Sequence, residues 1–461
     1  MASFNTRVRV VEDNQTFHVF EPTRRVHFLT DPAGAFIIEK LKENNYPTSL
    51  YTDTSRLFGL GPGDVDKYLN QFMAYGLFQP PRENPVFHDD YIKGYRELPA
   101  GYAFPPNVFY WVITWACNLR CAMCPLWSPQ ASRHTTDAQI SEPALSLGDA
   151  RRVLSRLARA GTRIIHITGG EPLLYDHLVE SIRHIRETGM MATVFSNGTL
   201  IDETRARELI GTGIEKIGVS LDGTETVHDQ IRGRGNFSRA ISGLTHLLKA
   251  RRDAKGQTRI YFMNTVTRRN YYQLPDLLKL AAEVGADGMF VAHPAFTGAD
   301  APDRQGQILS SCFFPSLDGP SWQVGQSLIA DEVSEIPVER LFDIIDTLHG
   351  MAGKLGLEFS PNLAMSKEEL NRYYNSDRDS VIDRCLWPWQ GGFVDPCGRV
   401  YPCVKIRAGD LKEDDFFELW NSEIYRRFRR LIKAKGLIPC CERCCQLINE
   451  QTRYDLTRLG V

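Results

Sequence analysis

The sequence lacks the features that would indicate a membrane, secretion or nucleic acid. No run approaches the roughly 18 consecutive apolar residues that a membrane-spanning helix needs. Residues 1–9 hold no apolar core of a signal peptide. The 54 Lys and Arg nearly balance the 56 Asp and Glu, so the formal charge of −2 gives no electrostatic reason to bind nucleic acid or lipid. We therefore expect neither a membrane nor a nucleic-acid partner.

Evidence for a disulfide framework is also missing, although the chain has 11 cysteines. A chain of 461 residues can bury a large core without disulfides, and no leader directs it to an oxidising compartment. Cysteines in such a chain more often bind metal or take part in catalysis. The sequence therefore predicts a protein of the reducing cytoplasm.

One short loop carries three of these cysteines and organises the chain. Cys117, Cys121 and Cys124 directly follow an apolar run at 108–113, which predicts a buried strand. Three thiolates can hold three irons of a [4Fe–4S] cluster, and the absence of a fourth cysteine leaves one iron open. A zinc site usually has four ligands in paired spacings, so zinc is the weaker interpretation.

This cysteine spacing resembles that of the radical S-adenosylmethionine (SAM) enzymes. The resemblance implies that SAM's amino and carboxylate groups bind the open iron. It further implies that an electron from the cluster cleaves SAM to a 5′-deoxyadenosyl radical, which takes a hydrogen atom from the substrate. An electron donor such as a flavodoxin or ferredoxin is implied as a partner. The protein's own task is to bind and orient the cofactor and to exclude water.

The middle of the chain, residues 106–356, alternates apolar runs with helical patterns. This alternation predicts an α/β fold with a parallel sheet, and six such units match the open, partial (β/α)6 TIM-type barrel of the radical SAM family. Active sites of such barrels lie at the C-terminal ends of the strands. The expected strands lie at 108–113, 164–167, 192–195, 216–219, 260–266 and 289–292. The expected helices lie at 147–160, 177–188, 203–211, 237–251, 274–284 and 338–355.

Glycine, serine and acidic residues follow the second, third and fourth of these strands. The motifs read Thr-Gly-Gly-Glu-Pro at 168–172, Ser-Asn-Gly-Thr at 196–199 and Ser-Leu-Asp-Gly at 220–223, with an arginine at 232. Each alone is an ordinary turn sequence, but their order resembles the peptide-modifying branch of the family. The resemblance implies these contacts to SAM: Gly169, Gly170 and Glu171 to the amino group, Ser196 and Asn197 to the ribose, Ser220 and Arg232 to the carboxylate.

Residues 1–82 read as a compact module of three short strands and helices. The strands are expected near 8–11, 17–20 and 26–29, and the helices at 33–44 and 64–75. The module resembles the winged-helix-like recognition element of maturases that modify ribosomally made peptides. That resemblance implies that the leader of a precursor peptide adds as a strand to the small sheet. A packing accessory or a DNA-binding winged helix is the alternative, and the lack of a basic helix disfavours DNA.

The last part of the chain, residues 357–461, crowds seven cysteines between Cys385 and Cys445. The pattern resembles the auxiliary-cluster domains called SPASM and twitch. By that resemblance we assign Cys385, Cys403, Cys441 and Cys444 to one auxiliary [4Fe–4S] cluster. A second cluster that uses the other three cysteines, Cys397, Cys440 and Cys445, is an alternative to a single cluster. A structural zinc is a further alternative.

These expectations predict a radical SAM maturase that modifies a ribosomal precursor peptide, most simply by an oxidative carbon–carbon, ether or thioether crosslink. Sulfatase maturation is disfavoured, because Val404 stands where that branch has a catalytic aspartate. Epimerisation is an alternative and would need a hydrogen donor, a role that the lone Cys312 could fill. A twitch-type dehydrogenase of a small molecule and a non-enzymatic peptide-binding scaffold also stay open. The expected divisions are 1–82, a linker at 83–105, the barrel at 106–356 with a loop or insertion at 301–335, and 357–461.

Overall fold

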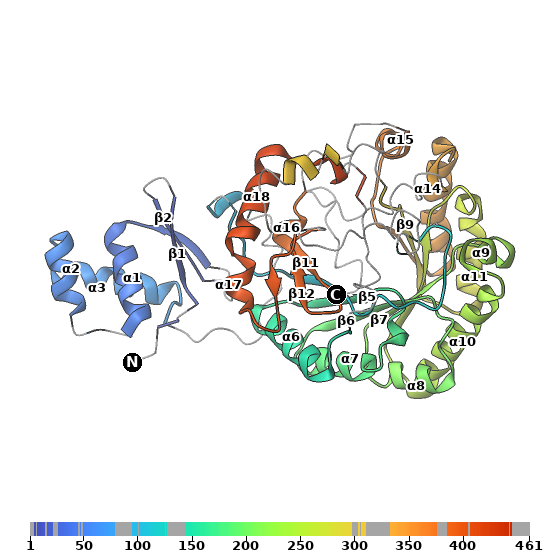
Figure 1. Ribbon diagram of the computed structural model, residues 1–461, viewed down its shortest axis with the longest axis horizontal. Helices are drawn as coiled ribbons and strands as arrows, with labels where there is room; N and C mark the ends of the chain where they lie inside the picture. The colour runs from blue at the N-terminus through green and yellow to red at the C-terminus, as the bar shows by residue number, and fades with distance from the viewer. Residues whose placement is uncertain are drawn as a thin grey trace.

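The computed structural model has a small N-terminal domain beside a large parallel sheet that the C-terminal residues extend (Figure 1). The described residues are 4–5, 7–13, 16–21, 26–44, 47, 49–78, 95–99, 101–124, 126, 143–296, 303–304, 306–309, 332–375, 385–403, 406–441 and 443–444. Most of the linker expected at 83–105 and of the loop at 301–335 lies outside them, as do Cys312, Val404 and Cys445.

The N-terminal domain packs three helices on a three-stranded antiparallel sheet. Strands β1 (Arg9–Asp13), β2 (Thr16–Glu21) and β3 (Val26–Thr30) pair in that order, and β2 lies in the middle. Helices α1 (Pro32–Asn44), α2 (Leu50–Phe58) and α3 (Pro62–Ala74) follow. Helix α3 buries Val65, Leu69 and Phe72 at helical spacing. The buried core of the N-terminal domain is separate from that of the barrel.

The N-terminal domain contacts Tyr102 and helix α17 (Phe416–Trp420), which is followed by α18 (Glu423–Lys435). Phe20 of β2 packs edge-on against Tyr102, with ring centroids 5.8 Å apart. The guanidinium of Arg7 lies 4.6 Å from the centroid of the Phe417 ring, and Arg9 pairs with Glu418. In both views the domain lies to one side, next to α17 and α18 in Figure 1.

The large sheet has ten strands in the order β10-β9-β8-β7-β6-β5-β4-β11-β12-β13. Eight neighbours run parallel, from β10 to β11, and β12 and β13 continue antiparallel. No pairing joins β10 to β13 among the described strands, so the predicted open barrel is confirmed. The bounds are β4 (Val108–Val112), β5 (Ile164–Thr168), β6 (Met191–Ser196), β7 (Lys216–Ser220), β8 (Arg259–Thr265), β9 (Gly288–Ala292), β10 (Glu358–Pro361), β11 (Gly391–Val394), β12 (Arg399–Tyr401) and β13 (Gly409–Asp410).

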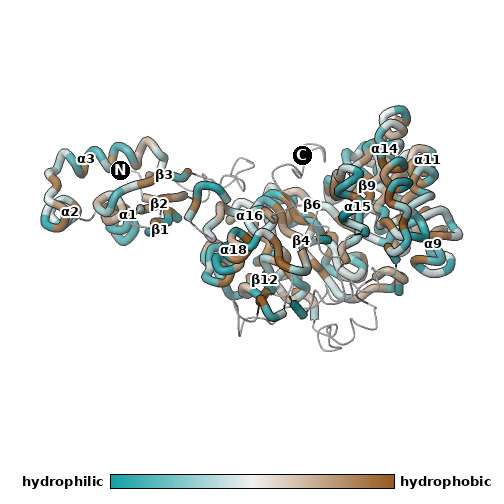
Figure 2. Tube along the Cα trace, turned by 90° about the horizontal axis from the view of Figure 1, so that it is seen from above, coloured by the Kyte–Doolittle hydropathy of each residue, from teal (hydrophilic) through white to brown (hydrophobic). Residues whose placement is uncertain are grey.

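Amphipathic helices cover the outside of this sheet. In α6, Ser146 caps the first turn by accepting a hydrogen bond from the Asp149 N–H, and the inward face buries Val153, Leu154 and Leu157. Figure 2 shows apolar β4 and β6 near the centre and mixed apolar and polar residues along the helices. The helices are α6 (Leu147–Ala160), α7 (Leu178–Glu187), α8 (Glu203–Ile210), α9 (Glu225–Arg232), α10 (Asn236–Ala254), α11 (Leu274–Val284) and α14 (Val338–Leu355).

Two parallel strands, β10 and β11, extend the six that the sequence predicts. Both are short, and β10 contains a proline, which an edge strand tolerates. Because β10 pairs with β9, residues 358–361 belong to the barrel sheet, and we propose that the cysteine-rich domain begins after α15 (Lys367–Asn375). Helices α16 (Trp387–Gln390), α17 (Phe416–Trp420) and α18 (Glu423–Lys435) complete that domain.

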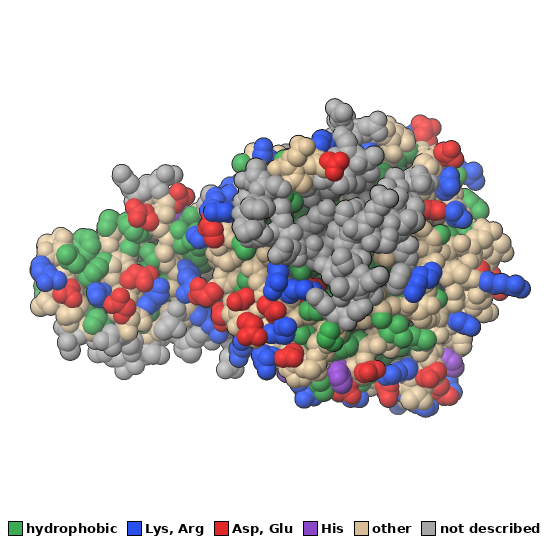
Figure 3. All heavy atoms as spheres, in the orientation of Figure 1, with side chains coloured by type: hydrophobic (Ala, Val, Ile, Leu, Met, Phe, Trp, Pro, Cys, Tyr) green, Lys and Arg blue, Asp and Glu red, His purple; other side chains and the backbone are tan. Residues whose placement is uncertain are grey.

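Two observations on the described residues concern membrane-spanning helices and surface charge. No described helix combines the length and the apolar character needed to cross a bilayer. Figure 3 shows acidic and basic side chains intermingled over the described part of one face.

Candidate active site

A cavity of about 930 Å³ lies within the barrel, and both predicted groups of cysteines line it. The first group, which we call the loop cysteines, is Cys117, Cys121 and Cys124. The second, which we call the outer cysteines, is Cys385, Cys403, Cys441 and Cys444. Of the other predicted site residues, Gly169, Gly170, Ser196, Asn197, Ser220 and Arg232 also line the cavity. The fold therefore brings two distant stretches of sequence to one enclosed space.

The loop cysteines lie close enough to repel one another as thiolates. Burial raises the pKa of Cys124 to about 11, and the neighbouring Cys121 and Cys117 add to this rise. The Ala122 N–H donates to the Ile231 carbonyl at 2.8 Å, which ties the loop to α9. Thiols held together at a raised pKa need a cationic partner to ionise, and iron supplies one.

The outer cysteines come from three segments of the chain and also meet. Burial raises the pKa of Cys441 well above its usual range, and Cys403, Cys385 and Cys444 contribute in that order. Cys397 does not line the cavity; its sulfur lies 3.8 Å from the Pro143 carbonyl. The side chain of Cys440 and all of Cys445 lie outside the described residues.

Neither group has the geometry of a site for one metal ion. Within the described parts of the chain, no three His, Cys, Asp or Glu side chains converge closely enough to hold a single ion. Zinc needs such convergence, with every sulfur about 2.3 Å from one centre. A cubic cluster places a separate iron before each thiolate, so its ligands stand farther apart. We therefore propose clusters for both groups of cysteines in place of the structural zinc alternative.

Gly169 and Gly170 lie against the start of the cysteine loop. The Gly170 N–H donates to the Thr114 carbonyl and the Glu171 N–H to the Ala116 carbonyl, both at 2.8 Å. A Cβ atom on Gly169 would lie 2.4 Å from the Thr114 oxygen, and one on Gly170 would lie 2.1 Å from the Ala116 oxygen. Only glycine permits this approach, which joins the two loops that the sequence assigns to cluster and SAM.

Glu171 serves mainly as an acceptor for the loop after β6. Its carboxylate is 1% exposed and accepts hydrogen bonds from the Ser196 hydroxyl at 2.7 Å, the Asn197 N–H at 2.8 Å and the Leu173 N–H at 3.2 Å. Burial raises the pKa of Glu171, and the bonds from Asn197 and Ser196 partly oppose this. Unlike the neighbouring Gly169 and Gly170, Glu171 is not among the residues that line the cavity, so the structure places it behind the wall and not in the predicted direct contact with SAM's amino group.

Asn197 is tied back to the cysteine loop through a residue that the sequence analysis missed. Its side-chain Nδ2 donates to Asn118 Oδ1 at 2.9 Å, and Asn118 Nδ2 donates to Thr199 Oγ1 at 2.8 Å. Asn118 lies directly after Cys117. Its position inside the cysteine motif was the available signal, and its hydrogen bonds make it a positioning residue for both loops.

Arg232 reaches the cavity from the end of α9, paired with a buried acid. Its Nε donates to Asp222 Oδ2 at 2.5 Å, and Asp222 also accepts from the Thr265 N–H at 2.8 Å. Burial alone would lower the pKa of Arg232, but Asp222 and Cys121 raise it, so the guanidinium stays charged. Asp222 occupies Nε, and Nη1 lies 4.0 Å from Cys121 Sγ, so Nη2 is the nitrogen that can serve a carboxylate beside Ser220.

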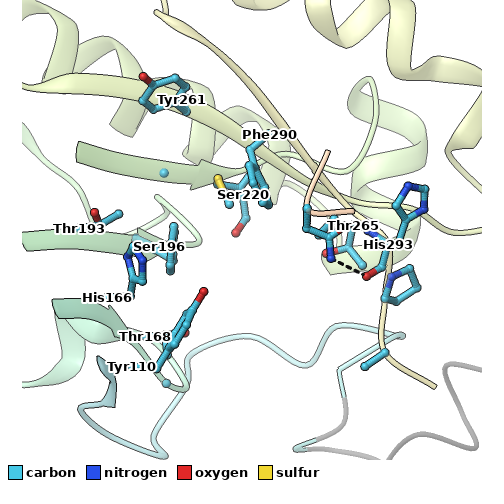
Figure 4. A pocket seen from close by; sticks show the side chains of 18 of the residues that line it. Tyr110, His166, Thr168, Thr193, Ser196, Ser220, Tyr261, Thr265, Phe290 and His293 are labelled. Atoms are coloured by element: carbon cyan, nitrogen blue, oxygen red, sulfur yellow. Dashed lines mark hydrogen bonds between the residues drawn. The ribbon is translucent and has the colours of Figure 1, made fainter. Parts of the chain in front are cut away.

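A second set of polar residues, absent from the predictions, lies at the end of β9. His293 lines the cavity (Figure 4). Its Nδ1 lies 2.8 Å from the Tyr374 hydroxyl. Burial lowers the pKa of His293 to about 3, so its ring is neutral. A lone histidine after a strand has no spacing that distinguishes it in sequence.

Comparison with known proteins decides the family. The profile of the radical SAM superfamily matches residues 111–278, and that of SPASM, an iron–sulfur cluster-binding domain, matches residues 385–445. A PqqA peptide cyclase from Rhodopseudomonas palustris is 31% identical over 320 residues, which cover 66% of this chain and 73% of the cyclase. The chain belongs to the radical SAM superfamily. An AdoMet-dependent heme synthase from Methanosarcina barkeri is 26% identical over 342 residues, 73% of this chain and 88% of the synthase.

SuiB of Streptococcus suis is a solved structure with a fold similar to that of this chain. The SuiB structure with bound S-adenosylmethionine has a TM-score of 0.55 and 13% identity, and the match covers 98% of this chain and 100% of SuiB. At this identity the likeness speaks for the fold, including the N-terminal domain. The predicted family, cofactor classes and SPASM-type domain are confirmed: the chain is an enzyme that uses SAM and iron–sulfur clusters.

The residues present fit these cofactors. We propose that the loop cysteines hold the cluster that binds SAM and that the outer cysteines hold one auxiliary cluster. We further propose that the glycine loop, Ser196, Asn197, Ser220 and Arg232 surround SAM, with Glu171 supporting them.

Proposed function

We propose that this radical SAM enzyme modifies a ribosomally made precursor peptide, most simply by an oxidative crosslink. The observation that carries the proposal is the N-terminal sheet. Strand β3 has a pairing partner on one side only, β2, among the strands that the structure describes. An extended peptide can add to such an edge through backbone hydrogen bonds.

Apolar side chains beside this edge supply a surface for the peptide's side chains. Leu29 on β3 is 55% exposed, and Met73 at the end of α3 is 47% exposed. Tyr75 stacks on Phe28 of β3 with ring centroids 4.1 Å apart and is itself 37% exposed. Figure 3 shows apolar side chains among the charged ones on this domain. Exposed methionine and aromatic groups suit a peptide of variable sequence.

The cavity supplies the chemical part of the proposal. When bound, SAM and its reduced cluster supply the abstraction of a hydrogen atom. The walls made by β4–β9 would shield the reacting groups from water, and the outer cysteines would hold an electron acceptor beside the same space. One hydrogen would leave as an atom and the second as a proton, with the remaining electron passing to the acceptor at the outer cysteines. The loss of two hydrogens would leave a carbon–carbon, ether or thioether link.

Other substrate classes fit the N-terminal domain less well. The heme synthase relatives suggest a non-peptide substrate, but such a substrate would not bind along the edge of β3. SuiB has been solved with its precursor peptide SuiA, and that structure matches this chain with a TM-score of 0.54 and 13% identity over 98% of the chain. A flavodoxin or ferredoxin as electron donor, and the cytoplasm as compartment, complete the proposal.

The test is co-expression of the full chain with each short reading frame beside its gene. Mass spectrometry should find one peptide lighter by two hydrogens. An unchanged mass with a changed stereocentre would instead favour epimerisation. Absence of modification in every such peptide, together with turnover of a small alcohol, would contradict the proposal.

Peptide recognition by β3 has its own test with a matched control. Leu29→Glu places a charge on the proposed docking edge and should raise the KM for the peptide about tenfold, since about 1.4 kcal/mol of apolar contact is lost. Leu355→Glu alters an equally apolar side chain, 41% exposed, at the end of α14. Equal KM values for both variants would argue against docking at β3.

A further inference from the structure

Below the cysteines, the cavity carries two buried basic side chains on separate strands. His166 on β5 and Lys216 on β7 line it and are 5% and 7% exposed. Within the described part of the chain, neither ring nitrogen of His166 nor Nζ of Lys216 has a hydrogen-bond partner. The Tyr261 ring centroid lies 6.0 Å from Nζ, at the outer limit of a cation–π contact. A buried cation without a hydrogen-bonded partner is costly.

Strand register places these two residues in one row. Tyr110 pairs with His166, His166 with Thr193, and Thr193 with Lys216, on neighbouring strands β4 to β7. All four line the cavity, and we call them the floor row. In Figure 4, His166 and Thr193 lie at one end of the cavity and His293 at the other. Lys216 and His166 stand two strands apart, about 10 Å between backbones, with Thr193 between them.

The carboxylates of the protein near the floor row are already engaged. Glu215 accepts from the Ala192 N–H at 2.8 Å and pairs with Arg186. Glu358 accepts from the Tyr261 hydroxyl at 2.6 Å and pairs with Arg259. Both acids line the cavity, yet neither accepts a hydrogen bond from Lys216. Among the described residues, then, no carboxylate accepts a hydrogen bond from Lys216, which leaves its ammonium available to an anionic ligand.

Electrostatics sets the protonation of the floor row. Burial lowers the pKa of Lys216 to about 8, and Arg259 adds to this, so most Lys216 side chains are charged at neutral pH. Burial, with Lys216 contributing, lowers the pKa of His166 to about 3, so the imidazole is neutral and carries one N–H donor. The rotatable stem of Lys216 lets its ammonium turn toward a ligand in the cavity.

SAM's own carboxylate lies too far away to be this ligand under our assignment. Lys216 begins β7 and Ser220 ends it, so their backbones are about 13 Å apart at 3.3 Å per residue. Gly218 lies between them and lines the cavity without a side chain. A Cβ atom at this position would lie 2.5 Å from Met263 Cγ. An anion at the floor row therefore belongs to another molecule in the cavity.

We propose that the floor row is a carboxylate-binding subsite for the substrate, with Lys216 as the charge partner and His166 as a hydrogen-bond donor. The identification of the carboxylate with an acidic residue of a peptide rests on the proposed function. The subsite itself does not, because any substrate class with a carboxylate would use it.

The subsite is tested directly with sodium propionate, using propionamide at matched ionic strength as its neutral analogue. Propionate should raise the melting temperature of the reconstituted full-length holoenzyme by about 2 °C more than propionamide does. Lys216→Met should remove this difference and Lys216→Arg should keep it. Lys279→Met, an exposed control on α11, should respond like the unmodified enzyme. An equal response to both compounds, or a propionate response that survives Lys216→Met, would overturn the subsite.

A second experiment asks whether a peptide acid fills the subsite. In the precursor peptide that the enzyme modifies, one Glu→Gln or Asp→Asn change should lower kcat/KM at least about 30-fold, as loss of one partner of a buried charge pair does. The same change should have no further effect in Lys216→Met enzyme. If propionate binds as expected but no peptide is modified, the subsite stands and the peptide proposal fails. If a peptide is modified but its acids never couple to Lys216, the assignment to a peptide acid is wrong.

Discussion

The loop cysteines and the outer cysteines line the same cavity but depend on the fold in different ways. The loop cysteines lie within eight successive residues and are half-buried. The outer cysteines come from separated segments, and Cys385 and Cys441 are only 9% and 8% exposed and belong to the main core. Loss of the cluster from a local loop should cost little stability, whereas loss of the cluster from a distributed, buried group should lower the stability of the fold. The rate of SAM cleavage by the reduced holoenzyme without substrate allows variants of the two groups of cysteines to be compared.

Replacing all three loop cysteines by serine should have the largest effect. Production of 5′-deoxyadenosine should fall to background, at least about 1000-fold, because the cofactor carries the chemistry. The melting temperature should change by less than about 3 °C, since no core residue is removed. SAM cleavage that survives this change would refute the assignment of the cluster.

Arg232→Met should come next, with a KM for SAM raised about 30-fold by loss of a charged contact. The change also leaves Asp222 buried without its partner, so stability should fall. Adding Asp222→Asn should restore the melting temperature and leave the KM high. Recovery of both quantities together would mean that Arg232 acts only through the fold.

Glu171→Gln should reduce kcat/KM for SAM about tenfold, as loss of a supporting hydrogen-bond partner does. Glutamine offers an NH₂ group where the carboxylate now accepts from an N–H, so the loop after β6 should shift. Circular dichroism of bound SAM and the melting curve would record that shift. An unchanged kcat/KM would show that Glu171 is dispensable.

Cys441→Ser should have the smallest effect on SAM cleavage, within about twofold, because this group does not bind SAM in our assignment. It should nonetheless remove iron and lower the melting temperature by about 5 °C, since a buried cluster ligand is lost. Cys397→Ser is the matched control and should leave the iron content and the melting temperature unchanged. Equal iron loss in both variants would favour a second cluster that uses Cys397.

The sequence analysis predicted the rim of the cavity better than its interior. The cysteine loop and the glycine loop are contiguous motifs, so their positions after β4 and β5 follow from strand order. His166 and Lys216 are single residues in apolar strands, and only the pairing of β5, β6 and β7 places them in one row. The role of Glu171 also needed coordinates, because a motif does not tell which backbone N–H groups face a carboxylate.

Short strands set the other limit of prediction. The four-residue strands β10 and β11 have no alternating pattern, and each is stabilised mainly by the neighbour that it pairs with. The helix α9 was also missed, although it holds Arg232 and receives the cysteine loop. Local preference is weak in such segments, so tertiary contacts determine them.

Strand β11 has a consequence for how the enzyme can be divided. It hydrogen-bonds along β4, whose five residues Val-Phe-Tyr-Trp-Val are all buried. A truncated barrel ending before Cys385 would present that bare apolar strand to solvent as an open template for aggregation. The barrel and the C-terminal part should therefore melt as a single cooperative unit. As two separate fragments, they should fold only when both are produced in the same cell.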